Sequence, residues 1–163
     1  MNKRNIIMTI KSKKTFSSIR LLAVFAAIIS ALFIFAPALS NNDSVFSGFD
    51  ITFGVKIAGG VLAEGILPFS ALALTAYLLP IIAAVFLLIG KGRFSSVLSS
   101  VLLLAAVILL LAIRSYIKLK VTILGSVTFS SVEWTMMWGL IVSISLAAVA
   151  FLISVYEIYR VFR

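Results

Sequence analysis

The chain has 163 residues, of which 63% are apolar and 12% are charged, and its formal net charge is +9. Soluble domains are about 45–50% apolar and about 25% charged, and a short chain leaves much of its surface exposed, so this composition excludes a water-soluble fold. The chain contains no Cys and no His, which excludes disulfides, Cys/His zinc sites, thiol nucleophiles and imidazole catalysis.

The N-terminal segment, residues 1–20, is basic and contains no acidic residue. Basic segments beside a membrane span are typical of its cytoplasmic side, and each Lys or Arg near anionic headgroups contributes about 1 kcal/mol of binding. The positive charge of the chain is therefore assigned to topology and to anionic lipid. Nucleic acid is not expected as a partner.

The first uncharged apolar run covers residues 21–40. About 20 helical residues cross a hydrocarbon core of roughly 30 Å, so the run predicts a membrane span. A basic segment, an apolar run and Ala36-Pro37-Ala38 also follow the pattern of a cleaved signal peptide. The apolar run is longer than is usual for such a peptide, which favours an uncleaved helix. Cleavage would leave three spans and an external N-terminus.

Three further uncharged runs have the length of a span, at residues 67–90, 94–113 and 134–156. A single Asp, Lys or Arg at mid-span would cost about 2.5–3.5 kcal/mol on insertion scales, so the absence of charge is informative. The sequence predicts one all-α domain over residues 1–163, a bundle of four transmembrane helices. Pro80 lies midway along the second span and predicts a kink there.

The distribution of Lys and Arg predicts the orientation. Ten basic residues lie at the two termini and in the short link after the second span, whereas the outer loops, residues 41–66 and 114–133, contain four. Under the positive-inside rule both termini are cytoplasmic. We expect a multi-pass protein of the plasma membrane, and the small size and lack of Cys suit a bacterial inner membrane.

Both outer loops show the alternation of a half-buried strand. Residues 49–57 alternate apolar with polar or small side chains and precede Gly59-Gly60, while residues 117–123 alternate and precede Gly125-Ser126. We expect the loops to pair into a small antiparallel β-cap, with its apolar face resting on the outer ends of the helices. The alternative is a pair of irregular loops.

Small residues spaced by four let transmembrane helices approach closely. Such stripes occur in the first and fourth spans, and they are candidates for packing within the bundle or against a partner: Ala23, Ala27, Ala31, Gly139, Ser143 and Ala147.

Charged residues of the outer loops are the candidates for surface recognition. Glu64 and Glu133 precede the second and fourth spans, so two carboxylates could meet and bind a cation or act in hydrolysis. Alternatively, each caps a span or pairs with a basic residue. The candidate set is Asp50, Lys56, Glu64, Lys118, Lys120 and Glu133.

No catalytic constellation is visible, since no serine has a His or a Lys in its span. No acidic residue lies within the predicted spans, which disfavours a proton-coupled carrier. We expect a non-enzymatic structural or accessory subunit without a cofactor, which binds a protein partner or a second copy through the β-cap or a small-residue helix face. The alternative is a small oligomeric transporter or pore lined by hydroxyls: Thr75, Ser99, Ser100, Ser143 and Ser145.

Overall fold

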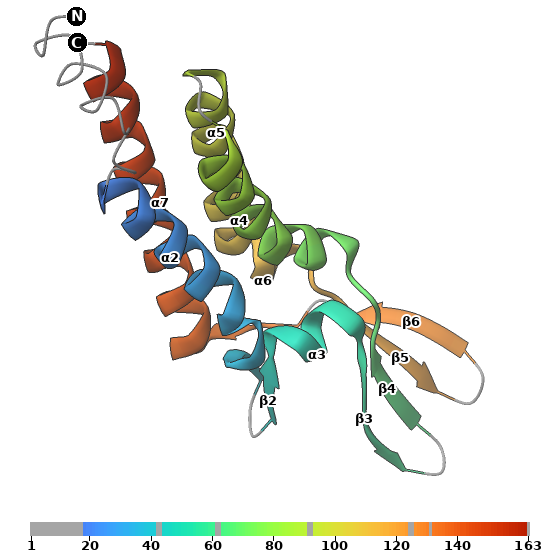
Figure 1. Cartoon of the computed structure of the whole chain (residues 1–163). Coiled ribbons are helices and arrows are strands. Elements are labelled where there is room, and N and C mark those ends of the chain that lie inside the picture. Colours follow the sequence, from blue (N-terminus) through green and yellow to red (C-terminus); the bar gives the residue numbers. More distant parts are fainter. Residues whose placement is uncertain are drawn as a thin grey trace, which may run out of the picture.

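The computed structural model describes residues 18–41, 44–60, 63–90, 93–123, 126–130 and 132–162, and gives no account of the side chains at 58–60, 63, 64, 93 and 160–162. Figure 1 shows a bundle of long helices that is joined at one end to β-hairpins. The long helices are α2 (Ser18–Leu32), α4 (Ala71–Ile89), α5 (Arg93–Leu111) and α7 (Trp138–Phe162).

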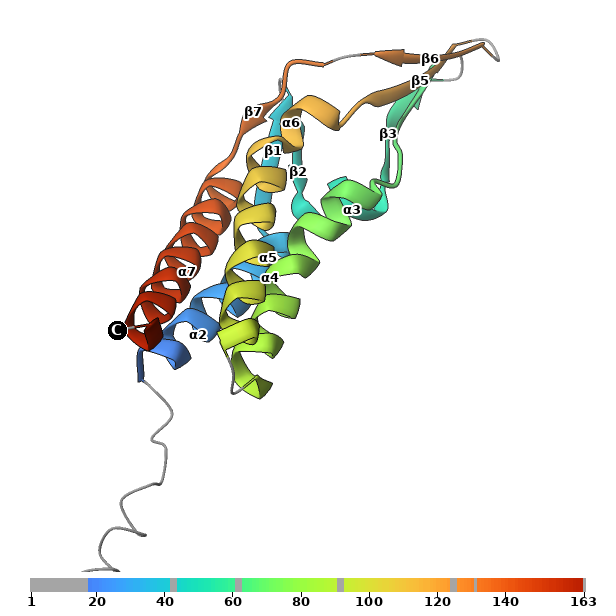
Figure 2. The ribbon, with the colours of Figure 1, turned by 90° about the horizontal axis from the view of Figure 1, so that it is seen from above.

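Each long helix packs against two others, in the cyclic order α2, α4, α5, α7. Including a 3₁₀ turn η1 (Phe33–Phe35) after α2, four helical segments are long and apolar enough to cross a membrane. The prediction of four helices that are long and apolar enough to cross a membrane is confirmed. The first residues of α2 and the last residues of α7 lie at the end of the bundle opposite the hairpins (Figure 2).

The first, second and fourth helices differ from their predicted bounds at the hairpin end. The second was predicted from residue 67, but Leu67 ends a strand and α4 begins at Ala71. The first predicted span reached residue 40, but strand β1 (Pro37–Asn41) replaces helix there. Pro37 disfavours helical backbone at the preceding residue, and Ala36 is extended, with φ −87° and ψ 159°. The fourth helix begins at Trp138, after strand β7 (Thr135–Met136), and continues to Phe162.

A three-stranded sheet that the sequence did not indicate extends the α2–α7 side of the bundle. Its strand order is β2–β1–β7, where β2 spans Ser44–Ser47 and both pairings are antiparallel. The Met137 amide also donates to the Ala38 carbonyl oxygen at 2.9 Å. These hydrogen bonds hold the segment that precedes α7 against the segment that follows α2, although about a hundred residues of sequence separate the two.

The segment predicted as the strand 49–57 is only partly extended. Its first part forms helix α3 (Gly48–Phe53), and strand β3 covers Val55–Gly60. A capping box causes the difference: the Asp50 amide donates to the Ser47 hydroxyl at 3.1 Å, and the Asp50 carboxylate accepts from the Ser47 amide at 2.9 Å. Gly54 ends the helix at a φ of +85° that other residues rarely adopt.

The two outer loops do pair into one antiparallel sheet, as expected. Its order is β3–β4–β5–β6, with β4 at Ala63–Leu67, β5 at Leu119–Ile123 and β6 at Ser126–Ser130. A short helix α6 (Ile113–Tyr116) leads from α5 into β5. The sheet does not lie flat over the bundle, however. Both views show its hairpins extending away from the helices (Figures 1 and 2), and β6 is exposed along its whole length.

The small-residue stripes of α2 and α7 are buried inside the bundle. Ala23, Ala27 and Ala31 are buried in α2, and Ala147 is buried in α7. The Ser30 hydroxyl donates to the carbonyl oxygen of Ser143 at 2.8 Å, and the Ser143 hydroxyl donates back to the Ser30 carbonyl oxygen at 2.9 Å. These faces are thus occupied by the chain itself.

Pro80 is fully buried within α4, and the helix continues through it to Ile89. The Thr75 hydroxyl donates to the Ala71 carbonyl oxygen at 2.8 Å, so it does not compensate for the amide that Pro80 lacks. The kink at this position stays a prediction.

Candidate functional site

The register of the four-stranded sheet assigns its side chains to two faces, because directly paired residues of antiparallel strands lie on the same face. Val55, Ile57 and Leu119 lie on the inward face and pack against the buried core cluster that includes Leu67 and Ile117. A row on the opposite, outward face crosses all four strands and consists of Lys56, Ile66, Lys120 and Phe129. Directly beside it is a second row, Glu64, Thr122 and Val127.

The outward face carries large apolar side chains on its edge strand. Phe129 is 64% exposed and Val127 is 51% exposed, and both belong to β6. The expectation of a Lys and Thr face toward water holds for β5 but not for β6. An edge strand that presents apolar side chains and an unpaired backbone edge is a surface at which proteins associate.

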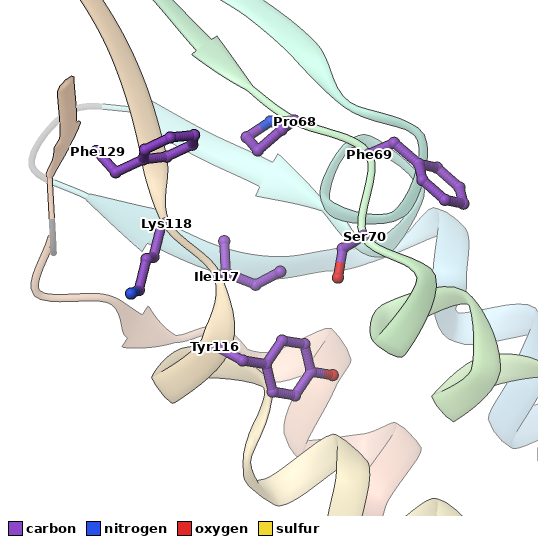
Figure 3. Close-up of a pocket in the computed structure, with 7 residues that line it drawn as sticks. All are labelled: Pro68, Phe69, Ser70, Tyr116, Ile117, Lys118 and Phe129. Carbon is purple, nitrogen blue, oxygen red and sulfur yellow. The ribbon is translucent and has the colours of Figure 1, made fainter. Parts of the chain in front are cut away.

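A pocket opens at the base of this sheet, where it meets the helices (Figure 3). Its volume is about 230 Å³. Figure 3 shows Phe129 and Pro68 on one side of the pocket and Tyr116 on the opposite side. The lining comes from the β4–α4 connection, from the α6–β5 connection and from β6: Pro68, Phe69, Ser70, Tyr116, Ile117, Lys118 and Phe129.

Few polar groups of the pocket are available to a ligand. The Ser70 hydroxyl accepts from the Ala73 amide at 3.3 Å and caps α4. The Tyr116 hydroxyl donates to the Leu109 carbonyl oxygen at 3.3 Å, and burial raises the pKa of Tyr116 to about 12. Tyr116 is therefore a neutral donor at physiological pH, and exposed Lys118 contributes the charge of the pocket. The pocket suits an apolar side chain with an adjacent acidic group.

The outer-loop candidates do not form one site. The register brings Lys56, Lys120 and Glu64 to the outward face, although Glu64 is placed only by its backbone pairing with Thr122. Asp50 caps α3 instead, and Glu133 is exposed in the connection from β6 to β7. The described residues contain no group of three His, Cys, Asp or Glu side chains that could hold a metal ion. The pairing of Glu64 with Glu133 stays a prediction.

Trp134, which the sequence placed at the start of the fourth span, is the residue that joins the two sheets. It is 7% exposed, and its indole N–H donates to the Ile117 carbonyl oxygen at 3.0 Å. Its ring packs edge-to-face on Phe46 of β2, with centroids 5.7 Å apart. One Trp thus connects the chain entering β5 with the three-stranded sheet. No spacing in the sequence indicated this role.

The hydroxyls proposed to line a transport path do not converge. Thr75 and Ser145 are exposed on the outside of the bundle and donate to carbonyl oxygens of their own helices. Ser99 is buried, but it also donates within its own helix, to the Ser95 carbonyl oxygen. Only Ser100 and Ser143 hydrogen bond to another helix, and they do so at separate places.

No protein-family model matches the chain, and no curated protein or solved structure shows significant similarity to it.

Proposed function

We propose that this protein is a non-enzymatic integral membrane protein, an accessory or structural subunit, that binds a partner protein through its outer four-stranded sheet. The observation that carries the proposal is the pair Val127 and Phe129, exposed on the outward face of an unpaired edge strand. The small-residue helix faces are used within the bundle, which leaves the sheet as the recognition surface.

The partner would add a strand along β6. An edge strand offers backbone N–H and C=O groups to an extended segment, and pockets for alternate side chains supply specificity. The sheet has two edges, β3 and β6. Only β6 is exposed along its whole length, and one of its residues, Phe129, also lines the pocket.

The partner strand should be acidic and should carry a large apolar residue. Lys118 and Lys120 lie beside Phe129, one in the pocket and the other in the outward row. Charge complementarity favours carboxylates opposite these lysines. A second copy of the chain fits less well, since its β6, Ser126–Ser130, contains no acidic residue to lie near these lysines.

Site-specific photocrosslinking in the native membrane tests this proposal. A crosslinker at Val127 should give one protein adduct, and a crosslinker at lipid-facing Leu104, which is also exposed on the bundle, should not give that adduct. With the captured partner purified, Phe129→Asp should weaken binding at least about 30-fold, as expected for an apolar anchor worth about 2 kcal/mol. Lipid adducts alone at Val127 would show that β6 contacts the bilayer and would refute the proposal.

The proposal requires the sheet to lie outside the cytoplasm and both termini to lie inside it, in a plasma membrane of bacterial inner-membrane type. Single cysteines test this directly, because the chain has none of its own. Ser126→Cys in β6 and Ser18→Cys at the start of α2 are both exposed positions. In intact cells a membrane-impermeant maleimide should label the first and spare the second until the membrane is opened. The reverse pattern would invert the topology.

The second candidate function is a small oligomeric transporter or pore. It is supported by one observation: Glu157 of α7 is only 8% exposed.

A further inference from the structure

Three phenylalanines form an exposed aromatic cluster beside the bundle. Phe35 ends η1, whereas Phe49 and Phe53 lie four residues apart on one face of α3. The rings of Phe35 and Phe49 stack with their centroids 5.9 Å apart, and the centroids of Phe49 and Phe53 are 4.5 Å apart. The three side chains are 68%, 44% and 49% exposed, in chain order. Contiguous apolar surface of this kind marks a site of contact with a partner or a membrane.

The other face of α3 is occupied by the protein itself. Ile51 and Thr52 are fully buried, and the Thr52 hydroxyl donates to the Gly48 carbonyl oxygen at 2.7 Å. The Asp50 carboxylate accepts from the amide and the hydroxyl of Ser47, at 2.9 and 2.7 Å. These polar side chains bond within the chain, so the phenylalanines are the part of α3 that faces outward.

Backbone contacts place α3 at the level where three of the four long helices begin or end. The Gly48 amide donates at 3.2 Å to the carbonyl oxygen of Ala36, which directly follows η1. The Ser70 amide donates to the Thr52 carbonyl oxygen at 3.0 Å, and Ser70 is the N-cap of α4. At the start of α7, a Cβ atom on Gly139 would lie 2.6 Å from the Ala36 Cβ. Figure 1 shows α3 at this end of the bundle, between the long helices and the hairpins.

The lengths of the helices put this level at a boundary of the hydrocarbon core. The segments Ser18–Phe35 and Ala71–Ile89 contain 18 and 19 residues. At 1.5 Å per residue they are about 27–29 Å long, against a core of roughly 30 Å. Helices of this length use all of it to cross the core, so their ends lie at its boundaries. Trp138 is exposed at the same level and contacts Phe33 of η1, and Trp is enriched at such boundaries.

The aromatic cluster continues the exposed apolar surface of the neighbouring helices. Leu32 of α2 is exposed three residues before Phe35, and Phe69 and Leu72 are exposed at the start of α4. We propose that α3 is an interfacial helix at the hairpin end of the bundle, and that the rings of the aromatic cluster insert among the lipid acyl chains of the leaflet there. A short helix with one apolar face and one face bound to the protein suits this position.

Such an anchor would hold the β3–β4 hairpin at a fixed height above the bilayer. Only Gly54 separates α3 from β3. The anchor is independent of any partner bound along β6, because β3 and β6 are the opposite edges of the sheet.

Site-directed spin labelling of the full chain in vesicles of phosphatidylcholine and phosphatidylglycerol tests the anchor. A nitroxide on a single cysteine reports collisions with oxygen, which concentrates in hydrocarbon, and with a water-soluble nickel chelate, which is excluded from it. Labels at Phe49→Cys and Phe53→Cys should collide more with oxygen than with nickel. Leu104→Cys, exposed near the middle of α5, is the lipid control, and Glu133→Cys, exposed before β7, is the water control.

The proposal predicts an oxygen-to-nickel ratio at both positions of α3 that is nearer to the ratio at Leu104 than to the ratio at Glu133. A ratio equal to that at Glu133 would place the aromatic cluster in water and overturn the proposal. Low collision rates with both reagents would show that protein covers the cluster, and would overturn it equally.

A second measurement needs no substitution in the aromatic cluster. Trp138 is exposed and Trp134 is buried, so lipid-accessible tryptophan emission comes from Trp138. Lipids brominated near the carbonyl end of the acyl chain should quench this emission more strongly than lipids brominated near the terminal methyl group. Equal, reversed or absent quenching would show that this level does not lie at the boundary of the core, and the proposal would fail.

Discussion

Replacing Trp134 by Ala is expected to destabilise the protein by about 3–5 kcal/mol, the range for removing a large aromatic side chain from a packed core. The substitution removes the edge-to-face contact with Phe46 and leaves the Ile117 carbonyl oxygen without its indole donor. The effect should be largest at the hairpin end of the molecule, because Trp134 joins the two sheets there. Hydrogen exchange should accelerate in β5 and β7 more than in the long helices.

Two further variants test how much of this destabilisation comes from the hydrogen bond and how much from the burial of the ring. Trp134→Phe keeps an aromatic ring against Phe46 but loses the indole N–H and part of the ring volume, so it should cost less than Trp134→Ala, about 1–3 kcal/mol. Trp138→Ala is the matched control, because Trp138 is 54% exposed and contacts Phe33 with its ring edge-to-face. We expect Trp138→Ala to change Tm only slightly. Equal losses in the two alanine variants would show that Trp134 does not join the sheets.

The four long apolar helices could be predicted because the signal is simple. The length and composition of an uncharged run can be determined from the run alone, because no residue distant in the sequence changes them. The strand at residues 119–123 could also be predicted, because Leu119 and Val121 alternate with Lys120 and Thr122. Its pairing with β4 follows because the two outer loops emerge at the same end of the helices.

Helix α3 shows where alternation misleads. Residues 49–53 alternate, but five residues also fit one turn of a helix, and the capping pair of Ser47 and Asp50 decides between the two. The spacing of a Ser and an acidic residue three positions later was present in the sequence and could have identified this start. Asp50, a candidate for surface recognition from the sequence, caps α3 in the structure.

The three-stranded sheet and the buried position of Glu157 could not be found in the same way. β1 and β7 pair across about a hundred residues of sequence, and β7 is only two residues long, so no local pattern carries the pairing. The sequence predicts that the fourth span ends at residue 156, because a charged residue such as Glu157 usually ends a span. Whether a helix continues past a charged residue depends on its tertiary surroundings, and α7 packs against both α2 and α5.

Gly139 is the position where a single added methyl group is expected to do the most damage. A Cβ atom there would lie 2.4 Å from the Pro37 carbonyl oxygen and 2.6 Å from the Ala36 Cβ. Since the nearest atom belongs to the backbone, a side-chain rotation cannot relieve the overlap. Gly139→Ala should therefore cost about 1–3 kcal/mol, the usual range for overpacking, and Gly139→Leu should cost more.

The direction of the change in Tm of Gly139→Ala distinguishes a steric clash from the effect of helix propensity. Helix propensity alone would make Gly→Ala stabilising, by up to about 1 kcal/mol, so a lower Tm for Gly139→Ala can come only from the close approach of α7 to the end of α2. Gly65→Ala is the matched control, because its added Cβ would meet the Ile57 Cβ at an ordinary 3.6 Å. We expect no loss of Tm in that variant. A Gly139→Ala protein that unfolds at or above the wild-type temperature would mean that α7 does not pack this closely against the residues that follow α2.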